Sequence, residues 1–451
     1  MHPVFRTVLT LPLALALAGP AAAQSGATSG TTSGTTTISR AGLGELLDAY
    51  GLIRQQYVNE VDDKKLLTAA IGGMLKSLDP HSEYLDKDYL LALARESSGQ
   101  YVGIGMEVTV ERGAMLVQGV SEDGPAARGG VRAGDRVVSV DGQPVTGLAY
   151  GAMARRFGGA PGSVLELVLA REGEPALRPL HLVRAAMHSA TVSTRAVGRN
   201  LAWIRIASFG EGTASELAAA LQGLDAKGAP RGLILDLRND PGGLVSAAAG
   251  VASAFLAPEQ ALFLVRGRGA EERVDVSMGR EALHAASADG APAWTRTVPL
   301  VVLVNGGSAS AAELLAGALQ DHRRATVVGT RTFGKGSIQS VIALTADSAV
   351  KMTVARYVTP LGREIQAVGL APDVEVAGVA SEPLLREADL AGHLPAVGDT
   401  PLAPAMAEDA KLFGSARDKA LQAAIARLQA DAPAPGAIAT GWSALLARVR
   451  R

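Results

Sequence analysis

The sequence is poor in several residue types, and each shortage excludes a class of protein or site. It has no cysteine among its 451 residues, which excludes disulfides, a thiol nucleophile and a cysteine-based metal site. Aromatic residues make up only 4% of the chain, so small residues must fill much of the interior. Neither sign of charge dominates, with 43 basic against 44 acidic residues. The sequence therefore has no electrostatic footprint for nucleic acid and no strongly basic membrane-binding face.

Apolar sequence, by contrast, is plentiful enough for sizeable cores. Hydrophobic residues are 48% of the chain and charged residues 19%, which excludes a mainly disordered protein. The length predicts about three domains of ordinary size.

The first 23 residues have the features of a secretory signal. Arg6 gives a charged start, an apolar stretch runs from Val8 to Leu17, and Ala21-Ala22-Ala23 is a small-residue cleavage signal. The apolar stretch is too short to span a bilayer comfortably, and an uncleaved anchor is the alternative. Residues 24–40 are rich in Gly, Ser and Thr and are expected to form a flexible linker. With no later stretch resembling a transmembrane helix, we expect an exported protein, periplasmic or otherwise outside the cytoplasm.

The rest of the chain divides into four regions of different pattern. Residues 41–100 have apolar residues at helical spacing. Residues 101–185 read as short alternating strands with glycine turns. From 186 to 380 apolar strands alternate with helices, which indicates a buried, largely parallel sheet. Residues 381–451 are rich in alanine and proline, with a helix expected over 410–429 and no chemistry. The fold class is therefore multidomain, with α/β and β parts.

One serine lies where an apolar strand, Leu300–Val304, gives way to a helix. The Ser310 hydroxyl would project from the carboxyl edge of the sheet, where open α/β sheets place their sites. The backbone N–H of Ala311 would be an unpaired helix-start donor, well placed for a developing oxyanion. A helix cap is the simpler interpretation of a serine at this position.

A pair of glycines follows another apolar strand, Leu233–Leu237. If the two strands are parallel, the loop carrying Gly242 and Gly243 lies at the same edge as Ser310. Glycine there would let a backbone N–H approach a reacting carbonyl, although an ordinary Pro-Gly turn explains the pair as well.

Lys335 lies between two glycines, with Gln339 four residues later. A lysine can act as general base for a serine if burial lowers its pKa from about 10.4 toward about 7–8. A solvated surface lysine is the alternative. The stretch from Gly329 to Lys335 also matches the start of a phosphate-binding loop, but Gly336 stands where Ser or Thr is required and a strand pattern follows.

From about residue 45 to 375 the chain resembles the carboxy-terminal processing peptidases, or tail-specific proteases. The segments that carry the resemblance occur in the right order; they are Ala70–Tyr84 (AIGGMLKSLDPHSEY), Gly103–Val108, Asp236–Gly243 (DLRNDPGG), Gly307–Glu313 (GSASAAE), Thr332–Gly336 (TFGKG), Tyr357–Arg363 and Gly369–Asp373.

The resemblance implies a serine endopeptidase with a Ser/Lys dyad and a PDZ domain inserted ahead of the catalytic core. It assigns Ser310, and not Ser308, as the nucleophile, Lys335 as the general base and Gln339 as the residue that orients the lysine. No metal or cofactor is implied.

Two further assignments come from the same resemblance. The oxyanion donors would be the N–H of Ala311 and that of either Gly242 or Gly243. Residues 101–185 would be the PDZ domain and 186–380 the protease core, and the PDZ strand would accept a substrate tail by β-augmentation. The carboxylate of that tail would bind the backbone amides of Gly103, Ile104, Gly105 and Met106.

The chain departs from the family pattern at one position. Relatives often carry Arg near the end of the PDZ domain, where it couples peptide binding to the active site, and this chain has Gly158 instead. We expect Arg155 or Arg156, just before it, to take that role; the alternative is that no arginine replaces it and the PDZ domain acts as a tether alone.

The sequence thus predicts an exported protease that cleaves protein or peptide substrates with free C-termini near those termini. An adaptor protein and a homo-oligomer remain open. The rival hypothesis is a non-catalytic PDZ-containing scaffold, against which the presence of Ser310, Lys335 and Gln339 argues.

Overall fold

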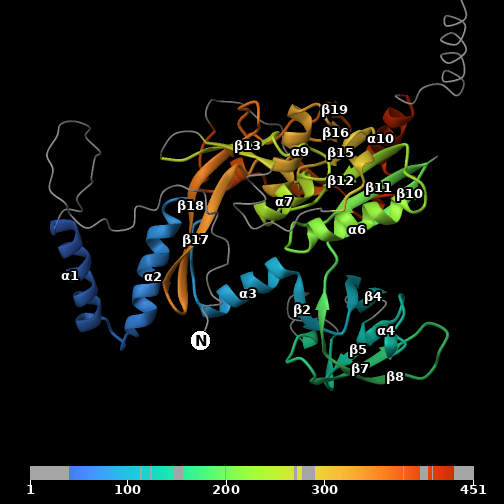
Figure 1. Ribbon diagram of the computed structural model, residues 1–451. Coiled ribbons are helices and arrows are strands. Elements are labelled where there is room, and N and C mark those ends of the chain that lie inside the picture. The colour runs from blue at the N-terminus through green and yellow to red at the C-terminus, as the bar shows by residue number, and fades with distance from the viewer. Residues whose placement is uncertain are drawn as a thin grey trace, which may run out of the picture.

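The computed structural model describes residues 40–111, 114–121, 124–145, 156–198, 200–268, 272–276, 290–378, 380–396, 405–408 and 410–430. The expected signal, nearly all of the linker and the last 21 residues lie outside the described residues. Figure 1 shows a helical N-terminal arm, a small β domain and a larger α/β core.

The centre of the core is a six-stranded sheet of order β10-β11-β12-β15-β16-β19. Only β10 runs antiparallel to its neighbour, so the expected largely parallel sheet is confirmed. The strands read as continuous apolar runs because both faces of the sheet are covered. Their bounds are β10 Val192–Val197, β11 Leu201–Ile206, β12 Gly232–Asp236, β15 Leu300–Val304, β16 Thr326–Gly329 and β19 Val374–Glu375.

Helices cover both faces of this sheet. On one face lie α6 (Thr213–Asp225), α7 (Val245–Ala252) and α9 (Ala311–Asp321), and on the other α10 (Lys419–Ala430). The helix expected over 410–429 is correct only in its second half. A 3-10 turn, Ala410–Leu412, precedes Gly414 at φ +74°, and that left-handed turn prevents a continuous helix.

A second sheet of the core receives a strand from the N-terminal arm. The arm holds α1 (Arg40–Gln56), α2 (Asp63–Lys76), β1 (Glu83–Leu85) and α3 (Lys87–Ser98), so it is helical except for β1. Strand β1 pairs antiparallel with β18, with Glu83 opposite Lys351. The sheet has the order β1-β18-β13-β14, and β17 also pairs with β18. Its other strands are β13 Ala261–Arg266, β14 Glu272–Asp275, β17 Ser337–Thr345 and β18 Ser348–Val358.

The small β domain has its own apolar core and its own sheet, of order β3-β4-β5-β7-β8 with β6 beside β5. Strands β2 (Gln100–Gly103) and β9 (Ala185–His188) pair with each other where the chain enters and leaves this domain. Its other elements are β3 Met106–Glu111, β4 Ala114–Val120, α4 Pro125–Arg128, β5 Arg136–Val140, β6 Gln143–Pro144, β7 Val164–Ala170 and β8 Arg178–Val183. Among the described residues β3 has one free edge.

The C-terminal region packs against the core through charge as well as apolar contact. Its other elements are β20 (Ala380–Leu384), the 3-10 turn η2 (Glu387–Asp389) and β21 (Ala405–Glu408). Outside this region, the 3-10 turn η1 (Ala293–Arg296) precedes β15 in the core. The buried Arg238 side chain donates hydrogen bonds to Asp236 at 2.6 Å and to Asp418, just before α10, at 2.7 Å. Asp236 and Arg238 of the DLRNDPGG segment therefore hold α10 on the sheet. No helix within the described ranges is long and apolar enough to cross a bilayer.

Candidate active site

Two loops meet at the carboxyl edge of the parallel sheet, as expected for neighbouring parallel strands. Strands β12 and β15 are adjacent, and the loops that follow them are joined by Asn239 and Asn305. The Asn305 side chain donates to Asn239 Oδ1 at 2.8 Å, and its own Oδ1 accepts the Asn239 N–H at 2.9 Å. The glycines after β12 are thereby brought to the serines after β15.

Ser310 lies at the turn between β15 and α9 in a strained conformation, with φ 53° and ψ −115°. A residue with a side chain adopts such a conformation at a cost on the order of 1–3 kcal/mol. The α/β-hydrolases use a strained strand-to-helix turn to expose a nucleophilic serine. Ser310 is partly exposed, and Ala311 is the first residue of α9.

Ser308 has the opposite environment. It is fully buried, its hydroxyl donates to the Leu237 carbonyl at 2.7 Å, and it accepts the Asn305 N–H at 2.9 Å. The bond to Leu237 holds the β15 loop against the β12 loop, and the bond from Asn305 closes the turn of the β15 loop itself. Ser308 therefore stabilises the two loops.

Lys335 lies in the loop between β16 and β17, half-buried, and this loop is fastened to the serine loop. The N–H of Phe333 donates to the Ser308 carbonyl at 3.0 Å. Burial lowers the pKa of Lys335, and the nearby charge of Lys351 lowers it further. The carboxylates of Glu387, Glu313 and Asp79 act in the opposite direction. Among the described residues no hydrogen bond joins the Ser310 hydroxyl to the Lys335 amine.

The buried Glu313 side chain joins the backbones of Ser310 and Lys335. Its Oε2 accepts the N–H groups of Ser310 and Lys335, both at 2.9 Å. Its Oε1 accepts the Gly334 N–H at 2.8 Å and the Thr332 hydroxyl. Burial raises the pKa of Glu313 to about 7, although all four hydrogen bonds oppose the rise.

Tyr357 makes the complementary connection from β18. Its buried hydroxyl is shared between the carbonyl oxygens of Ser310 at 2.8 Å and Lys335 at 2.6 Å. Sequence reasoning assigned no role to Glu313 or Tyr357. The Ser310-x-x-Glu313 spacing is a helix-start signature that points to Glu313, whereas no local pattern points to Tyr357.

The two glycines of the β12 loop differ in their hydrogen bonding. The N–H of Gly242 donates to Asp240 Oδ1 at 2.8 Å, whereas the Gly243 N–H has no partner among the described residues. Gly242 has φ +93°, and a Cβ there would lie 2.7 Å from the Ala309 carbonyl and 2.9 Å from the Ala311 nitrogen. Only glycine fits this contact with the serine turn. Burial raises the pKa of Asp240 to about 8.

Gln339 lies on β17, as the strand pattern after Lys335 predicted. Its Nε2 donates to Ser337 Oγ at 2.9 Å and to Thr353 Oγ1 at 3.1 Å. Neither bond reaches Lys335, so the lysine-orienting role stays a prediction.

The segment Gly103–Met106 connects β2 to β3 in the small domain. The carbonyls of Ile104 and Gly105 accept the N–H groups of Ala126 at 2.8 Å and Ser121 at 2.9 Å, which fastens this loop to α4 and the turn before it. Gly105 has φ +70° and lies against Gly124, so a side chain would not fit there.

Of the two arginines expected to couple this domain to the core, only Arg156 lies within the described residues. Arg155 lies outside them, and the Arg156 side chain donates to the carbonyls of Gln143 and Pro144, at 3.4 and 3.1 Å, within its own domain.

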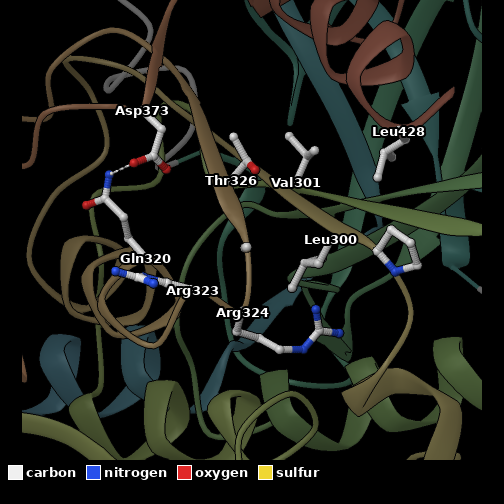
Figure 2. A pocket seen from close by; sticks show the side chains of 10 residues that line it. Leu300, Val301, Gln320, Arg323, Arg324, Thr326, Asp373 and Leu428 are labelled. Carbon is white, nitrogen blue, oxygen red and sulfur yellow. Dashed lines mark hydrogen bonds between the residues drawn. The ribbon is translucent and has the colours of Figure 1, made fainter. Parts of the chain in front are cut away.

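A cavity of about 350 Å³ lies at the opposite end of the core sheet from Ser310. Leu300 and Thr326, at the amino ends of β15 and β16, line it together with Arg323 and Arg324. Figure 2 shows the bond between Gln320 and Asp373 that borders it. This cavity is separate from the serine and lysine loops.

Three segments of the chain match described protein families. Residues 200–376 match "Peptidase family S41", residues 116–171 match "PDZ domain", and residues 18–89 match "Activating protease CtpB N-terminal domain".

Relatives match over most of the chain. A carboxy-terminal-processing protease of Bartonella bacilliformis is 37% identical over 358 residues, which cover 77% of this chain and 79% of the relative. The carboxy-terminal processing protease CtpA of Bacillus subtilis is 33% identical over 333 residues, 73% of this chain and 68% of the relative. A solved structure of a photosystem II D1 C-terminal processing protease is 33% identical to this chain. The match covers 74% of this chain and 86% of the solved chain, with a TM-score of 0.43.

The small β domain is thus a PDZ domain, and the expected fold class is confirmed. The chain belongs to peptidase family S41, among the carboxy-terminal processing proteases, and is a serine peptidase.

Proposed function

We propose that this protein is an exported endopeptidase that cleaves proteins near their C-termini with a Ser310–Lys335 dyad. One observation carries the proposal: Glu313 and Tyr357 fasten the backbones of Ser310 and Lys335 to each other from two sides. These two contacts fix the relative position of a strained, partly exposed serine and a half-buried lysine of lowered pKa.

The chemistry follows from these two side chains. Neutral Lys335 takes the proton of the Ser310 hydroxyl, and the serine oxygen attacks the scissile carbonyl. Lys335 then gives the proton to the leaving amine, and water hydrolyses the acyl-enzyme. The lowered pKa of Lys335 favours its neutral form, which is the form that acts as a base.

The oxyanion would be held by the backbone N–H groups of Ala311 and Gly243. Gly243 is the better candidate of the two glycines because the Gly242 N–H already donates to Asp240. Gly242 supplies the close approach, since its missing side chain lets the loop lie against the serine turn.

The PDZ domain, proposed to span 101–185, would capture the substrate tail. The free edge of β3 supports this, because an extended peptide adds to an open edge by main-chain hydrogen bonds. Its terminal carboxylate would meet the amides of Gly103–Met106. Export to the periplasm or a similar compartment is proposed from residues 1–23.

Labelling with a fluorophosphonate tests the nucleophile. The wild-type chain and the Ser308→Ala variant should be labelled on Ser310, while Ser310→Ala should not be labelled. Ser308→Ala should lower the free energy of unfolding by about 1–3 kcal/mol, because the Asn305 N–H and the Leu237 carbonyl lose their buried partner. Labelling of folded Ser310→Ala at the wild-type rate would overturn the assignment.

Replacing Lys335 with arginine tests the base. Lys335→Arg should label at least 100-fold more slowly, the lower end of what general-base catalysis contributes, because a guanidinium stays protonated at neutral pH. Mass spectrometry of the modified serine measures the rate, and circular dichroism checks the fold. Full reactivity of the arginine variant would remove Lys335 from the mechanism.

A further inference from the structure

A hydrogen-bonded pair of side chains, His81 and Glu387, joins the N-terminal arm to the C-terminal region beside the lysine loop. His81, in the turn between α2 and β1, places its Nε2 2.8 Å from Glu387 Oε2 and 3.0 Å from Oε1. The Glu387 side chain is 1% exposed and that of His81 18%. Neither residue was assigned a role from the sequence, and no chemistry was expected after residue 380.

The same carboxylate is connected to the loop that carries Lys335. Gln366 Nε2 donates to Glu387 Oε1 at 2.9 Å, and Gln366 Oε1 accepts the N–H of Gly336 at 3.0 Å. The Glu387 N–H donates to the Phe333 carbonyl at 3.3 Å. Glu387 therefore holds the lysine loop on both sides of Lys335.

Glu387 also contributes charge near the base. Burial alone would raise its pKa, but the bonds from His81 and Gln366 and the charges of His81 and Lys335 hold the pKa below its usual range. Glu387 is therefore an anion at neutral pH. The other charged groups that act on Lys335 are Glu313 from α9, Asp79 from the same turn as His81, and Lys351 from β18.

We propose that His81 and Glu387 are positioning residues for Lys335, which hold its loop through Gln366 and place a fixed negative charge near its amine. The inference rests on Lys335 being the general base, as proposed above. It means that both chain-terminal regions must be docked on the core before the base is correctly placed.

The experiment measures the rate of fluorophosphonate labelling of the full chain from pH 5 to 9. Replacing Glu387 with glutamine removes the charge but keeps an acceptor for Gln366. Without the anion the ammonium of Lys335 is less stable, so its pKa falls and the rising limb of the profile should move about 1 unit to lower pH. Glu387→Asp keeps the charge but shortens the reach, so it should leave the limb in place and slow labelling about tenfold.

Glu216→Gln is the matched control, because His188 and Glu216 form a similar pair, 2.6 Å apart, that does not contact the lysine loop. It should leave the limb unchanged. His81→Gln leaves the Glu387 charge in place, so it should slow labelling without moving the limb to lower pH.

Folded Glu387→Gln with the wild-type limb, or folded Glu387→Asp and His81→Gln with wild-type rates, would overturn the inference. If Glu387→Gln does not fold, the Glu387→Asp and His81→Gln rates decide. Ser310→Ala is run beside them: labelling of that variant would instead show that the proposed dyad itself is wrong.

Discussion

At the scale of single residues, the proposed site buries two carboxyl groups. Glu313 and Asp240 are fully buried, and neither forms an ion pair among the described residues. Asp240 Oδ2 has no hydrogen-bond partner there. Both pKa values are raised by burial, to about 7 for Glu313 and about 8 for Asp240. The folded protein therefore binds protons near neutral pH that the unfolded chain has released.

The Asp240→Asn variant should show this as a changed pH dependence of stability. A raised carboxyl pKa stabilises the fold fully below the unfolded value of about 4, and this stabilisation is lost as the pH rises toward 8. Asparagine does not ionise, and its Oδ1 still accepts the Gly242 N–H. Raising the pH from 5 to 8 should lower the free energy of unfolding of both proteins. The decrease in the variant should be smaller than the decrease in wild type by at least about 1 kcal/mol. Urea unfolding at both pH values measures the difference, and equal losses would contradict the assignment.

At the scale of elements, the proposed active site lies where loops leave the parallel strands. The β12 loop contributes glycines, the β15 loop the serine, and the loop after β16 the lysine. Tyr357 reaches the same point from β18, in the other sheet of the core. The β12 and β15 loops are in direct contact, because Gly242 lies against Ser310 and Ala311.

A pair of glycine substitutions separates this contact from backbone strain alone. Gly242 and Gly228 have similar φ values, +93° and +96°, but nothing lies within 4 Å of a Cβ at Gly228. Gly228→Ala should cost about 1 kcal/mol of stability and leave kcat unchanged. Gly242→Ala should cost more and lower kcat at least tenfold, since its methyl group displaces the serine turn. Urea unfolding and hydrolysis of β-casein measure both, and equal kcat for the two variants would contradict the contact argument.

At the scale of the whole molecule, the core binds segments from both ends of the described chain. The PDZ domain is inserted between two of its strands instead. The β2–β9 pair is where the chain passes between the PDZ domain and the core. Arg156 bonds inside the PDZ domain, so the described residues give the expected arginine coupling no support. Capture of the substrate is the role that the open β3 edge favours.

Binding of one peptide in two forms tests that capture. A short apolar peptide with a free C-terminal carboxylate should bind the full-length Ser310→Ala variant at least tenfold more tightly than the same peptide amidated. The amide loses the charge-assisted hydrogen bonds to the Gly103–Met106 segment. Isothermal titration calorimetry measures both affinities. Equal affinities, or unchanged affinity after deletion of residues 101–185, would remove the PDZ domain from carboxylate capture.

The sequence by itself determined the fold class, the sheet and the candidate site residues. Continuous apolar strands such as Leu300–Val304 require burial on both faces, and that requirement alone predicts a parallel sheet between helices. The position of Ser310 at a strand-to-helix turn is likewise a local property.

Only the tertiary structure decided which residues hold the site together. Tyr357, Gln366, His81 and Glu387 come from distant segments, and no local periodicity predicts which distant backbone a side chain will reach. The difference between Gly242 and Gly243 is also a tertiary property, because it depends on which N–H the Asp240 carboxyl accepts. The local sequence pattern predicts burial and backbone conformation. Hydrogen bonds between remote segments, by contrast, form only when the chain has packed.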